Sequence, residues 1–170
     1  MKLDRFLIGF EGLKLGKHNY NFLVDNSFFR LLEYSEIQEG QVVIDAVFTK
    51  SERLMKMDLN FKGEVIIPCD LCGESLVQEI LFDETVIIKI GDNEDEDDGI
   101  IILGSEATEF NISHYLYESI SLSLPSRRVH PKVDGKPRCN KDLLSKLNPV
   151  QGDEGGDKID PRWAALKKLK

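Results

Sequence analysis

Cysteine, histidine and tryptophan are scarce in this sequence, which has three cysteines, three histidines and one tryptophan among 170 residues. A small, odd number of cysteines does not support a framework of disulfide bonds. The opening residues MKLDRFLIGFEGL interleave charged and apolar side chains, so we expect no secretion signal there. We therefore expect a cytoplasmic protein whose thiols stay reduced.

Long apolar segments and the common catalytic motifs are also missing. No run is long and apolar enough to span a bilayer, so we expect no membrane association. The glycines of GDEGG (152–156) lie in a polar segment, outside the strand-to-helix context of a phosphate-binding loop. The residues suggest no Ser-His-Asp arrangement. No motif therefore points to catalysis on a small-molecule substrate.

The charge is unevenly distributed along the chain, although the net value is -8. The segment 91–99 carries only acidic charges, and the run Glu94–Asp98 lacks the alternating ligands of a calcium loop, so a solvated loop is the simpler interpretation. The segment 126–141 is basic and is a candidate for binding RNA phosphates. Alternatively, this loop is merely solvated or pairs with the acidic run.

Alternating apolar and polar residues predict strands over the first two-thirds of the chain. In LMKMDLNFK (54–62) every second residue is apolar, as in a strand with one buried face. Other segments are rich in β-branched residues and bounded by Gly, Asp or Glu, which also indicates strands. The expected strands are 19–24, 40–49, 54–62, 64–68, 75–82, 84–91 and 99–104.

Helices are expected mainly later in the chain. In residues 110–125 apolar side chains recur every fourth position, which places them on one helical face. Short helices are expected over 26–34 and 141–147. The expected caps are Asn26 or Ser27 for the early helix and Asn111 or Ser113 for the longer one.

These elements predict an α+β fold. We expect a mainly antiparallel sheet or barrel-like meander with a Cys-x-x-Cys knuckle, followed by a few short helices and a tethered C-terminal helix. The expected division is one domain over 1–147, a flexible linker over 148–158, and an amphipathic helix over 159–170. In that helix Trp163, Leu166 and Leu169 share one face, which we expect to dock on its own domain or on a partner.

Cys69 and Cys72 stand three positions apart in PCDLCG (68–73). The spacing suits half of a metal site, a redox pair, or two buried thiols. A structural zinc site needs four ligands, usually thiolates and neutral imidazoles. Gly73 lets the backbone turn, and the strand-like flanks predict a knuckle at a hairpin tip. The economical ligand set is Cys69, Cys72, His130 and Cys139.

Four protein ligands would leave no coordination position for a substrate, so this zinc ion would be structural. In the simplest alternative, all three cysteines are reduced and unliganded and His130 is exposed. A thioredoxin-like pair places its first cysteine at a helix N-terminus, where its pKa falls. The residues after Gly73 favour a strand, so a thiol oxidoreductase is the less favoured interpretation.

Three segments carry a resemblance to a known family: PCDLCGESL, FNISHYLYESISLSLPSRRVHPKVDGKPRC and DPRWAALKKL. In this order they resemble the YceD family, the large ribosomal RNA subunit accumulation proteins. The resemblance implies a non-catalytic bacterial ribosome-biogenesis factor that promotes synthesis, processing or stable accumulation of large-subunit rRNA. It also implies that the four Cys/His positions named above and Asp160, Pro161, Arg162, Leu166 and Leu169 are family motif positions.

Two mechanisms are compatible with this resemblance. In the first, the chain binds large-subunit rRNA or a pre-ribosomal particle through basic residues displayed around the zinc site. In the alternative, it is an adaptor whose C-terminal helix docks on a ribosomal protein or ribonuclease without RNA contact. The expected RNA-binding residues are Arg127, Arg128, Lys132, Lys136 and Arg138. The expected partner-binding residues are Asp160, Pro161, Arg162, Trp163, Leu166 and Leu169.

Overall fold

The computed structural model describes most of the chain. The described residues are 3–32, 34–52, 54–91, 100–133, 136–137 and 139–147. The acidic run 94–98, Arg138, the expected linker 148–158 and the expected helix 159–170 lie outside these ranges.

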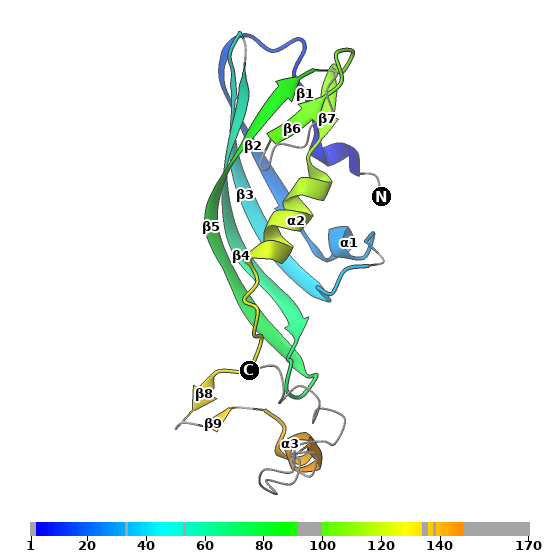
Figure 1. Cartoon of the computed structure of the whole chain (residues 1–170), viewed down its shortest axis with the longest axis vertical. Coiled ribbons are helices and arrows are strands. Elements are labelled where there is room, and N and C mark those ends of the chain that lie inside the picture. Colours follow the sequence, from blue (N-terminus) through cyan, green and yellow to red (C-terminus); the bar gives the residue numbers. More distant parts are fainter. Residues whose placement is uncertain are drawn as a thin grey trace, which may run out of the picture.

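A five-stranded sheet in the order β2-β3-β4-β5-β6 forms the body of the molecule (Figure 1). Neighbouring strands are antiparallel from β2 to β5, whereas β6 runs parallel to β5. The expected antiparallel sheet is therefore confirmed, and β2 and β6 are its two edges. The bounds are β2 Gly16–Val24, β3 Glu39–Lys50, β4 Met55–Pro68, β5 Ser75–Ile90 and β6 Ile100–Leu103.

Shorter elements surround the sheet. The strands β1 and β7 pair with each other, as do β8 and β9. The helices α1 and α2 lie on the concave side of the curved sheet, while β8, β9 and α3 gather near one end of it (Figure 1). The bounds are η1 Leu3–Phe6, β1 Leu7–Gly9, α1 Asn26–Phe29, β7 Glu109–Asn111, α2 Ser113–Ser123, β8 Lys132–Val133, β9 Lys136–Pro137 and α3 Lys141–Leu147.

The core lies between the concave face of the sheet and the elements that cover it. In β4 the apolar residues at alternate positions are buried, as the period of two predicts. Leu116 and Ile120 of α2 are fully buried against this core. The burial of both layers removes apolar surface from water, which is the main favourable contribution to folding.

Two helix starts differ from the sequence-based expectation. The N-cap of α1 is Asp25, whose side chain accepts from the backbone N–H of Phe28, and the helix ends at Phe29. Asn26 instead accepts from the N–H of Gly40, which ties the helix to β3. The N-cap position of α2 is Ile112, although the Asn111 side chain does accept from the N–H of Ser113 at 2.9 Å.

Gly63 marks a close approach between β3 and β4. A Cβ atom at this position would lie 2.1 Å from the carbonyl oxygen of Gln41 and 2.7 Å from Cα of Val42. Both neighbours are backbone atoms, so they cannot move aside as a flexible side chain would. The pairing of these strands therefore requires glycine at position 63.

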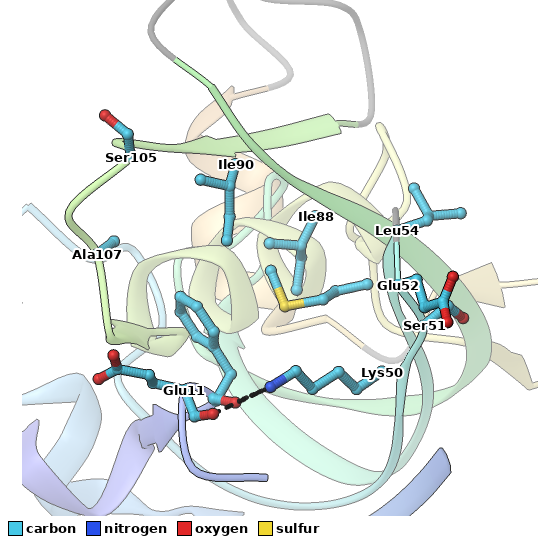
Figure 2. Close-up of a pocket in the computed structure, with 11 residues that line it drawn as sticks. Glu11, Lys50, Ser51, Glu52, Leu54, Ile88, Ile90, Ser105 and Ala107 are labelled. Atoms are coloured by element: carbon cyan, nitrogen blue, oxygen red, sulfur yellow. Dashed lines mark hydrogen bonds between the residues drawn. The ribbon is translucent and has the colours of Figure 1, made fainter. Parts of the chain in front are cut away.

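A hollow of about 440 Å³ lies where β3 ends and β4 begins (Figure 2). The ammonium group of Lys50 reaches the carbonyl oxygens of Phe10, Glu11 and Leu13 at 2.7, 3.1 and 3.0 Å. An ammonium group has three donors, so these three acceptors occupy all of them. Lys50 therefore fastens the 10–13 turn to the sheet and has no proton left to offer a ligand.

Among the described residues, no helix combines the length and the apolar character needed to cross a bilayer.

Candidate metal centre

The knuckle forms the tip of the hairpin between the two longest strands, β4 and β5. Their pairing ends at Pro68 and Ser75, so the six residues between them make the turn. The N–H of Gly73 donates to the carbonyl oxygen of Cys69 at 2.8 Å, and Gly73 has a φ of 69°. This left-handed conformation favours glycine, so the expected role of Gly73 in the turn is confirmed.

The segment that carries His130 is fastened to the knuckle by Asp70. The N–H of Asp70 donates to the carbonyl oxygen of Arg128 at 2.7 Å, and the Asp70 carboxylate accepts from the N–H of Arg128 at 2.6 Å. Further along, the Asn140 side chain donates to the Glu74 carboxylate at 2.9 Å. These contacts bring His130 and Cys139 to the hairpin tip from a distant part of the sequence.

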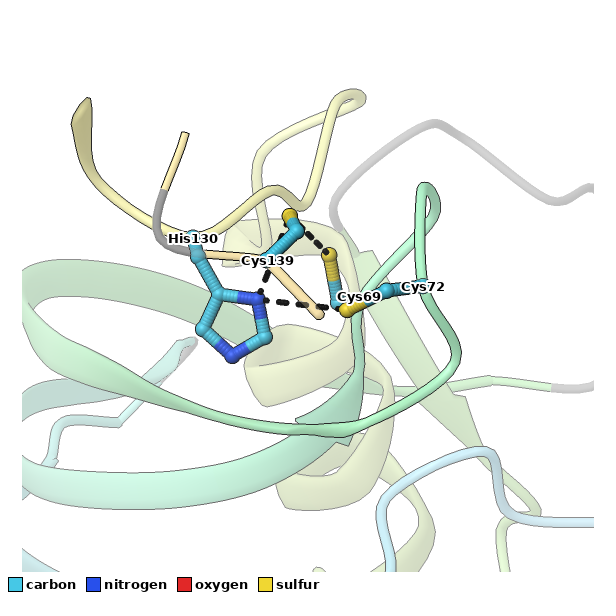
Figure 3. Close-up of side chains that lie close together, drawn as sticks. All are labelled: Cys69, Cys72, His130 and Cys139. Atoms are coloured by element: carbon cyan, nitrogen blue, oxygen red, sulfur yellow. Dashed lines mark hydrogen bonds between the residues drawn. The ribbon is translucent and has the colours of Figure 1, made fainter. Parts of the chain in front are cut away.

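Four ligand-type side chains meet at this point: Cys69, Cys72, His130 and Cys139 (Figure 3). Their three sulfurs and one imidazole nitrogen all lie within 4.8 Å of one another. All three cysteines are buried and none forms a disulfide bond, and His130 is half-buried. The expected set of four residues is therefore clustered.

Three of the six distances between the ligand atoms match the edges of a tetrahedral zinc site. Zinc–sulfur bonds of about 2.3 Å and zinc–nitrogen bonds of about 2.0 Å imply edges of about 3.8 Å between sulfurs and about 3.5 Å from sulfur to nitrogen. The Sγ atoms of Cys69 and Cys139 are 3.8 Å apart. Nδ1 of His130 lies 3.6 Å from Sγ of both Cys72 and Cys139.

The second nitrogen of His130 selects the tautomer that a metal needs. Nε2 lies 3.2 Å from the carbonyl oxygen of Ser75, an acceptor only. Nε2 must therefore carry the proton, which leaves the lone pair of Nδ1 free and directed at the sulfurs. A ligating histidine is commonly held by such a bond to a backbone carbonyl.

The electrostatics of the cluster also favour a cation. Burial raises the pKa of the Cys69 thiol, but backbone amides of the knuckle and of His130 outweigh this effect and lower the pKa to about 6. Burial and the neighbouring sulfurs of Cys69 and Cys72 raise the pKa of Cys139 to about 11. Three adjacent thiolates repel one another, and a divalent cation removes that repulsion.

The other two histidines lie outside the cluster. Nε2 of His18, on β2, is 2.8 Å from the carbonyl oxygen of Lys14. His114, on α2, pairs with Glu118 one turn later. Cys72 is followed by β5 and not by a helix, so the knuckle lacks the helix N-terminus of a thioredoxin-like pair.

The comparison with family models decides the family. The model described as "Large ribosomal RNA subunit accumulation protein YceD" matches residues 57–170, which is more than half of the chain. The chain belongs to the YceD family. No curated protein and no solved structure matches the chain. The family is named for a role in the accumulation of large-subunit rRNA and not for an enzymatic activity.

The basic residues of this YceD protein differ in their surroundings. Arg127 is exposed and makes no hydrogen bond or ion pair with any residue that the structure describes. The guanidinium group of Arg128 pairs with the Glu36 carboxylate at 2.7 Å. Lys132 and Lys136 lie in β8 and β9, next to the metal cluster in sequence. Arg138 and all six expected partner-binding residues lie outside the described ranges.

Sequence reasoning missed the groups that support the ligands. Asp70, Glu74 and Asn140 fasten the two halves of the site, and the backbone carbonyl of Ser75 orients His130. For Asp70, the only signal in the sequence was that an aspartate stands between the two cysteines of the knuckle. A backbone acceptor leaves no signal at all, because every residue has a carbonyl group.

Proposed function

We propose that this chain promotes the accumulation of large-subunit rRNA by binding RNA through the segment 126–141. In this proposal Cys69, Cys72, His130 and Cys139 hold a structural zinc ion that fixes the segment to the knuckle. The observation that carries the proposal is the convergence of these four ligand atoms within 4.8 Å of one another. The family supplies the connection to large-subunit rRNA.

Zinc suits this donor set for chemical reasons. Three thiolates and one imidazole form a common set of structural zinc ligands, and they leave no open position for a substrate. A bound ion would neutralise the crowded sulfurs and cross-link a hairpin tip to a segment 58 residues further along, as measured from Cys72 to His130. The role of the site would then be to order a surface.

The segment that such a site would order is basic in sequence. Arg127 is exposed, and it directly precedes Arg128, whose backbone is hydrogen-bonded to Asp70. Arg128 itself acts as a positioning residue, since its side chain is paired with Glu36 and its backbone with Asp70. We assign the phosphate contacts to Arg127, Lys132, Lys136 and Arg138. Contacts of this kind supply affinity without reading sequence.

The test is crosslinking in living cells followed by sequencing of the attached RNA. The native protein is compared with Cys72→Ser and Arg127→Glu. The matched control is Arg30→Glu, because Arg30 is an exposed arginine at the end of α1, outside the segment 126–141. We expect large-subunit rRNA to be enriched with the native protein and the control, reduced with Arg127→Glu, and lost with Cys72→Ser.

The purified protein gives an independent measurement of the same proposal. Its affinity for large-subunit rRNA should fall with salt, and each phosphate contact contributes about 0.7 to 0.9 to the slope of log affinity against log salt. Arg127→Glu should reduce the magnitude of that slope by at least the contribution of one phosphate contact. If the native protein enriches no large-subunit rRNA, direct RNA recognition is wrong, whatever its zinc content.

A further inference from the structure

A groove of about 400 Å³ lies beside the C-terminal half of α2. One wall is α2, and the other is the stretch that leads from α1 towards β3. Apolar side chains dominate the lining. They are Tyr34, Ile37, Tyr117, Leu122 and Leu124.

Several of these apolar groups are exposed in one place. Leu122 is 85 % exposed although it lies on α2, and Tyr34 is 61 % exposed. The ring of Tyr34 meets the buried ring of Tyr117 edge-on, with 5.5 Å between centroids. Single exposed apolar residues are common, but a group that borders one hollow marks a binding surface.

The charges around the groove favour a basic occupant. Glu36 and Glu118 stand at its edge, and the side chains of both are more than half exposed. Among the lining residues that the structure describes, two carboxylates stand against one guanidinium group, Arg128, which pairs with Glu36. Glu118 contacts His114 on the same helix. An acidic phosphate backbone would be repelled here, whereas a segment with lysines beside apolar residues would be attracted.

The chain contains such a segment in DPRWAALKKLK (160–170). It carries Trp163, Leu166 and Leu169 together with four basic residues and one acidic residue. We propose that residues 160–170 dock in the groove of the same chain, with Trp163 as the apolar anchor and the lysines facing Glu36 and Glu118. This proposal does not depend on RNA binding.

The length of the connection favours docking within one chain. Twelve residues, 148–159, separate α3 from the segment, and an extended chain of that length spans about 40 Å. Asn140, which precedes α3, is bonded to Glu74 of the knuckle. Arg128, which borders the groove, is bonded to Asp70 of the same knuckle. The hairpin tip therefore contacts both the residue that precedes α3 and a residue that borders the groove, and a short tether gives a high effective concentration.

The test uses the full chain, in which Trp163 is the only tryptophan. We expect its fluorescence emission to be blue-shifted and protected from acrylamide. Leu122→Glu should shift the emission to the red and raise the quenching constant severalfold. Leu81→Glu is the matched control, because Leu81 is also exposed, at 66 %, but lies on the outer face of β5. Thermal unfolding checks that both variants remain folded.

Charge reversal tests the acidic edge separately. Glu118→Lys should partly expose Trp163, and adding Lys167→Glu with Lys168→Glu should restore its protection. The proposal is wrong if acrylamide quenches Trp163 in the native chain as readily as it quenches free tryptophan. The segment would then be available to bind a partner. The proposal is equally wrong if Leu122→Glu leaves Trp163 protected, or if protection grows with protein concentration, which would indicate a second copy.

Discussion

The sheet and the knuckle end of the molecule, which comprises residues 69–74 and 126–147, are stabilised by different forces. The sheet buries large apolar side chains on its concave face, among them Phe48, Phe61 and Ile44, all fully buried. Among the described residues of the knuckle end, the buried apolar side chains are Cys69, Cys72 and Cys139, and Leu71, Val129 and Leu144 are partly buried. Segment 126–147 is attached to the hairpin by a few hydrogen bonds and by the ligand cluster.

This difference shows where a metal ion has the most to contribute. A sheet with a continuous apolar core needs no additional cross-link to fold. For a segment with two two-residue strands and a seven-residue helix, we expect packing alone not to offset the entropy of ordering it. We therefore expect the two regions to respond separately to substitution.

Loss of the proposed zinc ion should have the largest effect, confined to the knuckle end. Structural zinc sites contribute on the order of 10 kcal/mol of binding free energy. Cys139→Ser or a chelator should therefore abolish amide protection in 126–147 while β3 and β4 stay protected. Hydrogen exchange measured with mass spectrometry checks both regions, and His114→Gln is the control for a ligand-type residue outside the cluster. Protection of 126–147 without metal would show that packing alone holds it.

A core substitution should destabilise the sheet and leave the knuckle end unaffected. Phe61 is fully buried and stacks on Phe82 with 4.3 Å between ring centroids. Phe61→Ala should lower the free energy of unfolding by about 3 to 5 kcal/mol. Urea unfolding measures this loss, and zinc titration of the folded protein should give an unchanged affinity. A matching loss of zinc affinity would show that the two regions are coupled.

Removal of the Asp70 carboxylate should weaken the junction between the two regions. Asp70→Ala keeps the backbone donor to Arg128 but leaves the N–H of Arg128 without its carboxylate acceptor. For this exposed hydrogen bond we expect a cost of about 1 kcal/mol, or about a fivefold loss of zinc affinity. Competition with a chromophoric chelator measures it. Asp70→Asn, which retains an acceptor oxygen, should lose less.

The smallest effect should come from the cap of α1. Asp25→Ala should cost about 0.5 kcal/mol of unfolding free energy at neutral pH. Hydrogen bonds from Arg5 and Ser27 hold the pKa of Asp25 well below its usual range. A depressed folded pKa contributes stability above the unfolded pKa, so the advantage of the native protein over Asp25→Ala should shrink as pH falls below about 4.

The matched variant for that experiment is Asp25→Asn. Asparagine retains an acceptor for the cap but cannot ionise. Its stability relative to Asp25→Ala should therefore stay constant with pH. Urea unfolding at a series of pH values tests both variants, and a pH-independent difference between native protein and Asp25→Ala would contradict the role of the Arg5 pair.

Some features were predictable because they depend on local sequence. The alternation in 54–62 identified β4, since the period of two reflects a strand with one buried face. The cap of α1 was predicted wrongly, because Asp25, Asn26 and Ser27 are all good caps. Tertiary contacts made the choice: Asp25 pairs with Arg5, and Asn26 is engaged by Gly40 of β3.

The same division applies to the candidate site. The sequence by itself limited the candidates for a four-residue cluster, because it has only three cysteines and three histidines. It also determined that Cys69 and Cys72 lie together, since a hairpin turn with Gly73 is a local structure. Only the tertiary structure decided that His130 and Cys139 reach them, that His130 presents Nδ1, and that Arg128 is paired with Glu36 while Arg127 is exposed. These outcomes depend on contacts between residues far apart in the chain, for which local propensities carry no information.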